Sequence, residues 1–365
     1  MHLTLHVTNR CNLACRYCYA PAGQQDMTLA TAVAAIRNCA GGPDCGIIFF
    51  GGEPLLRADL IFDVIRWCER QETGRFHYKV TTNGVLLDDA FLDACDRHRL
   101  HVAMSHDGVP EAHDRFRVRA DGAGTFDALR PALQRLLKRR PYSPIMMTIN
   151  PETVPHFARS VAWLQAEGAQ YLICSLNYAG AWTDAALRRL RAEYRKLARW
   201  HFENYRRECK MYFSSFDKRI ATRVFEERGC SCALGRRQIS VGPDGRLYPC
   251  VQFVGRNDYV IGTAARGVDE ARRQALFCQN EAAKPVCAGC DLEGRCHNRC
   301  GCLNIQTTGN IREIPPILCA HERMVFPIAD RLAERLFARR DPMFIQRHYN
   351  PAFPILSFIE DLATP

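Results

Sequence analysis

The sequence predicts an α/β fold built on a parallel sheet, because short apolar runs alternate with helix-length segments through the first half of the chain. Six runs are expected to be strands, at 3–7, 47–50, 76–81, 100–105, 145–149 and 171–175. Helices between successive parallel strands must lie outside the sheet. The sheet is then either open and doubly wound or an incomplete barrel, and both architectures bind ligands at the carboxyl ends of the strands.

Helices are expected at 28–39, 58–70, 184–208 and 322–338, where apolar residues recur at helical spacing. The helix at 184–208 carries a basic stripe beside its apolar face, formed by Arg188, Arg191, Arg195 and Arg199. Such a stripe is either a solvated face or a docking face for an acidic peptide.

Composition excludes several classes of protein. The 365 residues are 47% hydrophobic and 24% charged, which is typical of a soluble globular chain and excludes disorder. Apolar runs are too short to span a membrane, and the first residues lack a signal-peptide pattern, so we expect a cytoplasmic protein. The net charge of +10 is a weak indication of an anionic partner.

Cysteine is the unusual residue: there are 19, of which eleven lie from Cys209 to Cys319. In a reducing compartment such clustering favours metal ligation over disulfides. Three more stand in a C-x3-C-x2-C loop after the first strand, at Cys11, Cys15 and Cys18. Three ligands are too few for a closed zinc site, although zinc completed by His6, or three incidental thiols, are alternatives.

Two further motifs follow the next two strands, GGEP at 51–54 and TTNG at 81–84. With the cysteine triplet, in this order, they resemble the radical S-adenosylmethionine (SAM) enzymes. The resemblance implies a partial (β/α)6 TIM-like barrel. It also implies that Cys11, Cys15 and Cys18 hold a 4Fe-4S cluster whose free iron chelates SAM, and that reduction releases a 5'-deoxyadenosyl radical.

The resemblance also implies which residues contact SAM. Glycines without a Cβ let backbone carbonyls approach the cofactor's ammonium, and a glutamate beside them adds negative charge or caps a helix. For Arg117 the alternative interpretation is a solvated side chain, and for Tyr19 it is ordinary packing. The expected contacts are Tyr19, Gly51, Gly52, Glu53, Asn83, Ser105 and Arg117.

The cysteines after residue 229 resemble the SPASM extension of this family, with a hairpin expected at GPDGRLYPC. The resemblance implies a first auxiliary cluster on Cys232, Cys250 and Cys300, whose fourth ligand is Cys230, Cys302 or absent. A second auxiliary cluster follows on Cys287, Cys290, Cys296 and Cys319. Between Cys296 and Cys300 this chain has His297, Asn298 and Arg299 where the family usually has Gly-Gly. A zinc ribbon from Cys287 to Cys300 is the rival interpretation.

The implied domains are a radical SAM core at 1–180, a helical linker at 181–228, an auxiliary-cluster domain at 229–321, and a carboxy-terminal helix and tail at 322–365. The expected function is modification of a ribosomally made peptide, such as a thioether or carbon–carbon crosslink. Sulfatase-maturase oxidation is the alternative; in that group an aspartate base follows the cysteine equivalent to Cys250, where this chain has Val251. A non-enzymatic iron–sulfur or zinc module is a third.

The expected partners are a precursor peptide or protein substrate and an external one-electron reductant, a flavodoxin or ferredoxin. We expect neither nucleic acid nor membrane as a partner. Because only ten residues precede Cys11, we expect leader recognition to rely on a separate protein or on another surface such as the arginine stripe.

Overall fold

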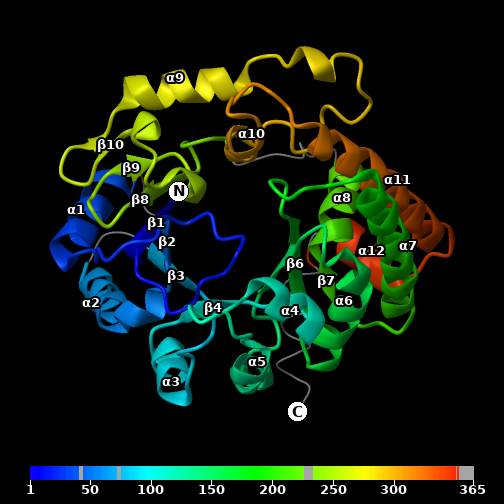
Figure 1. Ribbon diagram of the computed structural model, residues 1–365, viewed down its shortest axis with the longest axis horizontal. Coiled ribbons are helices and arrows are strands. Elements are labelled where there is room, and N and C mark those ends of the chain that lie inside the picture. Colours follow the sequence, from blue (N-terminus) through cyan, green and yellow to red (C-terminus); the bar gives the residue numbers. More distant parts are fainter. Residues whose placement is uncertain (41–43, 72–74, 226–232, 351, 353–365) are drawn as a thin grey trace.

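The computed structural model describes residues 1–40, 44–71, 75–225, 233–350 and 352. A nine-stranded sheet curves into a partial barrel with helices around its outside (Figure 1), in the order β7-β6-β5-β4-β3-β2-β1-β8-β9. All its pairings are parallel except that of β8 with β9. The predicted α/β class is confirmed, and the incomplete barrel is the architecture adopted.

The strands of the sheet are β1 (His2–Thr8), β2 (Asp44–Gly51), β3 (Arg75–Thr82), β4 (Leu100–Ser105), β5 (Ile145–Ile149), β6 (Tyr171–Leu176), β7 (Tyr212–Phe213), β8 (Gln238–Val241) and β9 (Leu247–Tyr248). A small separate hairpin joins β10 (Gly262–Thr263) to β11 (Gly267–Val268).

The helices are α1 (Leu29–Cys39), α2 (Ala58–Glu69), α3 (Asp89–Arg97), α4 (Pro110–Phe116), α5 (Phe126–Arg139), α6 (Phe157–Ala166), α7 (Asp184–Arg206), α8 (Ser214–Val224), α9 (Glu270–Glu281), α10 (Gly301–Thr308), α11 (Pro316–Ala338) and α12 (Pro342–Tyr349). None of the helices in these described segments has the length and apolar character needed to cross a bilayer.

Every predicted strand is present, but the prediction for the last long helix is wrong at its start. That helix, α11, begins at Pro316 and not near residue 322. Pro316 is its first residue, where a missing N–H costs no hydrogen bond, so a proline pair that resembles a loop in the sequence starts the helix. Cys319 therefore lies in the first turn of α11.

The segment after residue 229 contributes to the barrel sheet. Strand β8 pairs in parallel with β1, from His2 with Gln238 to Leu5 with Val241. The predicted hairpin is confirmed: β8 and β9 are antiparallel and joined through Gly245, whose φ of 80° favours glycine. The division into domains at residues 180, 228 and 321 stays a prediction.

The core explains why β1 has apolar and polar residues in alternation. Leu3, Leu5 and Val7 are fully buried in the main hydrophobic cluster with residues of the surrounding helices. Successive side chains of a strand point to opposite faces, so Thr4 and His6 point into the barrel, where both are also buried. The polar carboxyl ends of the strands form the open end of the barrel, which we call the mouth.

Candidate active site at the carboxyl ends of the strands

The cysteine triplet lies in a loop that leaves β1 and returns beside it. The N–H of Asn9 donates to the carbonyl of Gln25 at 2.9 Å, which closes the base of the loop. Burial raises the pKa of the Cys15 thiol to about 11, so ligation of a metal must displace its proton. The other two thiols, Cys11 and Cys18, are in exposed residues.

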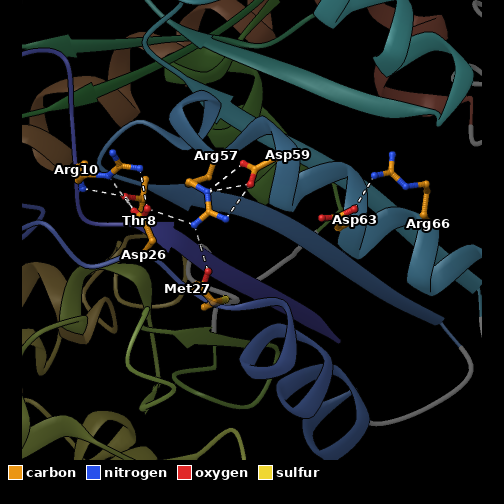
Figure 2. A network of polar contacts seen from close by, with 8 residues as sticks. All are labelled: Thr8, Arg10, Asp26, Met27, Arg57, Asp59, Asp63 and Arg66. Atoms are coloured by element: carbon orange, nitrogen blue, oxygen red, sulfur yellow. Dashed lines mark hydrogen bonds and ion pairs between the residues drawn. The ribbon is translucent and has the colours of Figure 1, made fainter.

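A polar network holds the two ends of this loop together (Figure 2). The Asp26 carboxylate accepts hydrogen bonds from Thr8 Oγ1 at 2.5 Å and from Arg10 Nη2 at 2.7 Å. Arg57, which follows GGEP, lies 3.3 Å from the same carboxylate. We call Thr8, Arg10, Asp26 and Arg57 the Asp26 clamp. It joins the start of the loop, the end of the loop and the segment after β2.

The two glycines of GGEP are required by the close approach of β2 to the loop. A Cβ at Gly51 would lie 2.3 Å from the Thr8 carbonyl oxygen, and one at Gly52 would lie 2.2 Å from that of Arg10. The N–H groups of Gly52 and Glu53 donate to these carbonyls at 2.9 and 2.8 Å. The glycines therefore pack the motif against the loop, in addition to any approach they allow to a cofactor.

Glu53 is buried and accepts three hydrogen bonds. They come from Thr82 Oγ1 at 2.6 Å, the Asn83 N–H at 2.7 Å and the Leu55 N–H at 3.1 Å. Loss of solvent raises its pKa to about 7, although the three donors oppose that rise. The carboxyl caps the short helix Pro54–Arg57, which is the helix-terminus role that the sequence suggested.

Asn83 connects the end of β3 to the cysteine loop. Its amide Nδ2 donates to Asn12 Oδ1 at 2.8 Å and contacts Cys11 Sγ at 3.8 Å. The N–H of Leu13 also donates to Cys11 Sγ, at 3.4 Å. The sulfur of Cys11 therefore already receives the N–H contacts that stabilise thiolate ligands.

Arg117 is buried and ion-paired, which excludes the solvated alternative. Its Nε donates to Asp107 Oδ2 at 3.0 Å, and the Tyr17 hydroxyl donates to the same oxygen at 2.7 Å. Although burial alone opposes its charge, Asp107 and Tyr17 raise the pKa of Arg117. The Thr148 N–H donates to Asp107 Oδ1 at 2.9 Å, so β5 supports the pair.

Ser105 and Tyr19 occupy different positions. Ser105 is the half-buried last residue of β4 and precedes the segment that contains Asp107. Tyr19 is 43% exposed. Loss of solvent around its hydroxyl raises the pKa of Tyr19, and the Cys250, Cys18 and Cys302 thiols raise it further. The Tyr19 hydroxyl is therefore near thiols of both the cysteine triplet and the carboxy-terminal cysteines.

Part of the expected first auxiliary ligand set is brought together. The sulfurs of Cys300 and Cys302 are 3.4 Å apart. Hydrogen bonds with the Cys250 and Cys300 thiols, followed by burial, raise the pKa of Cys302. The other two candidates, Cys230 and Cys232, lie outside the described residues.

The expected second auxiliary ligands line one pocket. Its wall contains all four of Cys287, Cys290, Cys296 and Cys319. Burial raises the pKa of Cys296 to about 12. Arg323 Nη2 lies 3.9 Å from Cys290 Sγ, so a cation is in place beside this pocket. The start of α11 at Pro316 is what brings Cys319 to the pocket.

The three residues that replace the usual Gly-Gly have partners. Asn298 is buried and its Nδ2 lies 3.6 Å from Cys287 Sγ. His297 Nδ1 lies 3.2 Å from Glu322, and Arg299 pairs with Glu281 at 2.6 Å. These contacts hold the segment between Cys296 and Cys300 in place without glycine.

The donor sets fit iron–sulfur clusters in chemistry. Each is made of thiols, which are the ligands of such clusters. Within the described part of the chain, no three His, Cys, Asp or Glu side chains are arranged so that they could hold a single metal ion. Cluster thiolates bind different iron atoms, so a ligand set for a cluster is spread and not convergent.

Sequence reasoning missed the residues that support the site. The Asp26 clamp and the Asp107 carboxylate do not belong to a recognisable sequence motif. Their role is visible only in hydrogen bonds between residues that are distant in sequence: Arg10 and Asp26 are 16 residues apart, and Arg117 and Asp107 are 10 apart. A usable signal existed for Asp107, which stands two residues after Ser105 in the SHDG segment.

Comparison with protein families finds that residues 5–164 match the model of the radical SAM superfamily. The chain is 31% identical over 173 residues to an uncharacterized protein of Methanocaldococcus jannaschii, covering 46% of this chain and 60% of that protein. It is 24% identical over 331 residues to the serine-type anaerobic sulfatase-maturating enzyme of Klebsiella aerogenes, covering 83% and 79%. It is 25% identical over 367 residues to the PqqA peptide cyclase of Gluconobacter oxydans, covering 93% and 98%.

Among solved structures, the fold is similar to that of anSMEcpe with bound AdoMet. The TM-score is 0.79 at 18% identity, and the match covers 91% of this chain and 94% of that one. The similarity of fold therefore extends through the cysteine-rich part of the chain, beyond the residues that match the family model.

Proposed function

Because residues 5–164 form a radical SAM domain, we propose that this protein is a radical SAM maturase that modifies a ribosomally synthesised peptide. Two relatives that span most of the chain carry the names of a peptide cyclase and a sulfatase-maturating enzyme. The observation that carries the proposal is the convergence on one cysteine loop of contacts from the ends of β2, β3 and β4.

In this proposal Cys11, Cys15 and Cys18 hold the 4Fe-4S cluster that binds SAM. When bound, the cluster and SAM supply a radical that abstracts a hydrogen atom from the substrate. The protein's own contribution is to hold the loop rigidly. The Asp26 clamp closes its base, the N–H of Glu53 anchors Arg10, and Asn83 donates toward Cys11.

We propose that the other residues expected to contact SAM do so at the same end of the barrel. Gly51, Gly52 and Glu53 lie against the cysteine loop, and we propose that backbone carbonyls of this motif meet the ammonium group of SAM. Arg117, held in a fixed position by Asp107, is the group proposed to meet the carboxylate of SAM. Ser105 and Tyr19 complete the proposed set.

The carboxy-terminal cysteines are proposed to hold two auxiliary clusters. Cys287, Cys290, Cys296 and Cys319 supply a full set in one pocket. For the first auxiliary cluster we propose Cys302 as the fourth ligand with Cys232, Cys250 and Cys300, because its thiol already contacts two of them.

A sulfatase-maturase type of oxidation is the second candidate, and the Klebsiella relative favours it. Val251 argues against it, since a valine directly after Cys250 cannot accept a proton. The external reductant, a separate leader-binding protein and the cytoplasmic location are part of the proposal.

The test is anaerobic reconstitution with iron, sulfide and SAM, followed by measurement of 5'-deoxyadenosine. A short peptide encoded next to the gene is then added, and its mass is measured. Loss of hydrogen atoms from that peptide supports the maturase. An aldehyde formed instead on a sulfatase-derived peptide supports the second candidate, and iron binding without any 5'-deoxyadenosine contradicts both.

A further inference from the structure

The solvent face of α7 carries a continuous row of arginines. We call Arg188, Arg191, Arg195 and Arg199 the α7 arginine stripe. At 100° per residue, the four fall within an arc of about 80°, and they extend about 16 Å along the helix. All four are exposed.

Packing determines which way the stripe faces. The opposite side of α7 is buried through Leu190, Tyr194 and Leu197, and its heaviest contacts are with α11. The helix therefore cannot rotate to hide the arginines, and the stripe faces water.

The stripe lacks carboxylate partners within the described chain. The ion pairs within α7 use other residues, Lys196 with Glu193 at 2.7 Å and Arg206 with Glu203 at 4.0 Å. Neighbouring arginines spaced three or four apart repel one another. On α5, by contrast, Arg139 is within ion-pair distance of three aspartates. The α7 arginine stripe is thus a charged surface without internal compensation.

The stripe begins at the rim of the proposed active site. Helix α7 starts at Asp184, after a connection of seven residues that follows the end of β6 at Leu176. The Trp182 Nε1–H donates to the Asn177 carbonyl at 2.7 Å, which holds this short connection at the carboxyl end of β6. Arg188 is therefore the member nearest the mouth, and Arg199 is the farthest along the outside of the barrel.

We propose that the α7 arginine stripe binds an acidic segment of the peptide substrate while another segment of that peptide reaches the mouth. This inference rests on the proposed function and adds the place and the charge of the recognition segment. Guanidinium groups bind carboxylates through paired hydrogen bonds. The helix lacks exposed large apolar or aromatic side chains among the described residues, so it offers neither stacking for single-stranded nucleic acid nor anchors for a lipid surface.

The experiment measures the binding of a fluorescent oligoglutamate peptide to the reconstituted full chain by anisotropy. We expect binding that weakens as salt rises, because exposed ion pairs are screened. Changing all four stripe arginines to Glu should weaken binding at least about tenfold, which corresponds to about 1.4 kcal/mol. Changing them to Gln, which keeps helix propensity, should weaken it in the same direction by a smaller factor.

The matched control changes Arg70, Arg75, Arg97 and Arg99 to Glu. These four are also exposed, and they alter net charge by the same amount. They lie at or beside the ends of α2 and α3 and the starts of β3 and β4, away from the mouth. The affinity of the control variant should stay within about threefold of wild type, because exposed charges far from the binding site contribute little to the binding free energy.

Equal weakening in both variants would show that only net charge matters and would overturn the proposal. So would an unchanged affinity in the stripe variants, or tighter binding of a single-stranded oligonucleotide than of oligoglutamate. Uncoupled production of 5'-deoxyadenosine is measured in parallel and should be unchanged in all variants. If the wild type produces no 5'-deoxyadenosine, the proposed function is contradicted. The anisotropy measurements would still show whether the α7 arginine stripe binds the acidic peptide.

Discussion

At the scale of single residues, Glu53 shows how the site differs from the surface. Its carboxyl is almost fully buried and is held by Thr82, Asn83 and Leu55. Loss of hydration raises its pKa from an ordinary 4.5 to about 7. The folded chain therefore retains a proton on Glu53 over a pH range in which the unfolded chain has lost it.

Glu53→Gln should remove a pH dependence of stability. Between pH 4.5 and about 7 the folded state binds one more proton than the unfolded state, so stability falls as pH rises, by at most about 3 kcal/mol in total. Urea denaturation of the cluster-free chain at several pH values measures this slope. The exposed Glu313→Gln is the control and should keep the slope of wild type. An equal slope in the Glu53 and Glu313 variants would contradict the assignment.

Cys302→Ala tests the fourth ligand of the first auxiliary cluster. The Cys302 thiol is buried and contacts Cys250 and Cys300, so its loss should lower bound iron by about four atoms per chain or alter the electron paramagnetic resonance of one cluster. The exposed Cys278→Ala should leave both unchanged. If Cys302→Ala binds as much iron as wild type and Cys230→Ala binds less, the fourth ligand is Cys230.

At the scale of elements, the loop after β1 depends on contacts from several strands. Its base is closed by the Asp26 clamp, and the N–H groups after β2 donate to carbonyls at its start. Each contact alone is modest, because a typical hydrogen bond contributes about 1 kcal/mol net. Together they hold three cysteines in one place before any metal arrives.

Asp26→Ala should loosen this loop. The change leaves Thr8 and Arg10 without their shared acceptor, so we expect a loss of about 1 to 3 kcal/mol in unfolding free energy. Cys11 and Cys18 should also react faster with an alkylating reagent in the cluster-free chain.

Asp63→Ala is the control for the clamp, and Figure 2 shows both sites. Among the residues that the structure describes, Asp63 pairs with Arg66 alone, one turn away on the exposed side of α2, and the loss in unfolding free energy should be below about 0.5 kcal/mol. Equal effects of the two changes on stability and alkylation would show that the clamp has no special role.

At the scale of the whole molecule, the cysteine-rich segment is joined to the barrel. Strand β8 extends the sheet beside β1, and the Tyr19 hydroxyl is near both Cys18 and Cys250. The main core also includes residues of α11 with those of the barrel strands. The proposed clusters are therefore carried by one connected body.

Changing Cys11, Cys15 and Cys18 together to Ala should separate catalysis from the auxiliary sites. We expect bound iron to fall from about twelve to about eight atoms per chain, and reductive cleavage of SAM to cease. Iron analysis and a 5'-deoxyadenosine assay measure the two effects. Continued production of 5'-deoxyadenosine in this variant would show that other residues hold the catalytic cluster. An iron content of the wild type that saturates near four atoms per chain would contradict the assignment of the auxiliary clusters.

The sequence by itself determined the alternation of strands and helices, since hydrophobic periodicity is local and survives without tertiary contacts. It also marked Cys11, Cys15 and Cys18 as one group, because ligands for one site recur at short spacings, as in C-x3-C-x2-C. It placed GGEP and TTNG at strand ends, which the structure bears out. Each of these properties belongs to a short segment of chain.

Periodicity alone left an open sheet and a barrel as alternatives, and the barrel that the family resemblance implied is confirmed only by the tertiary structure, because closure depends on strand order and β8 joins β1 from more than 230 residues away. It alone showed the Asp26 clamp, the burial of Arg117 against Asp107, and the contact of Cys302 with Cys250. These interactions join segments with no shared periodicity or motif. Ion pairs and desolvation depend on distance in space, which residue order does not reveal.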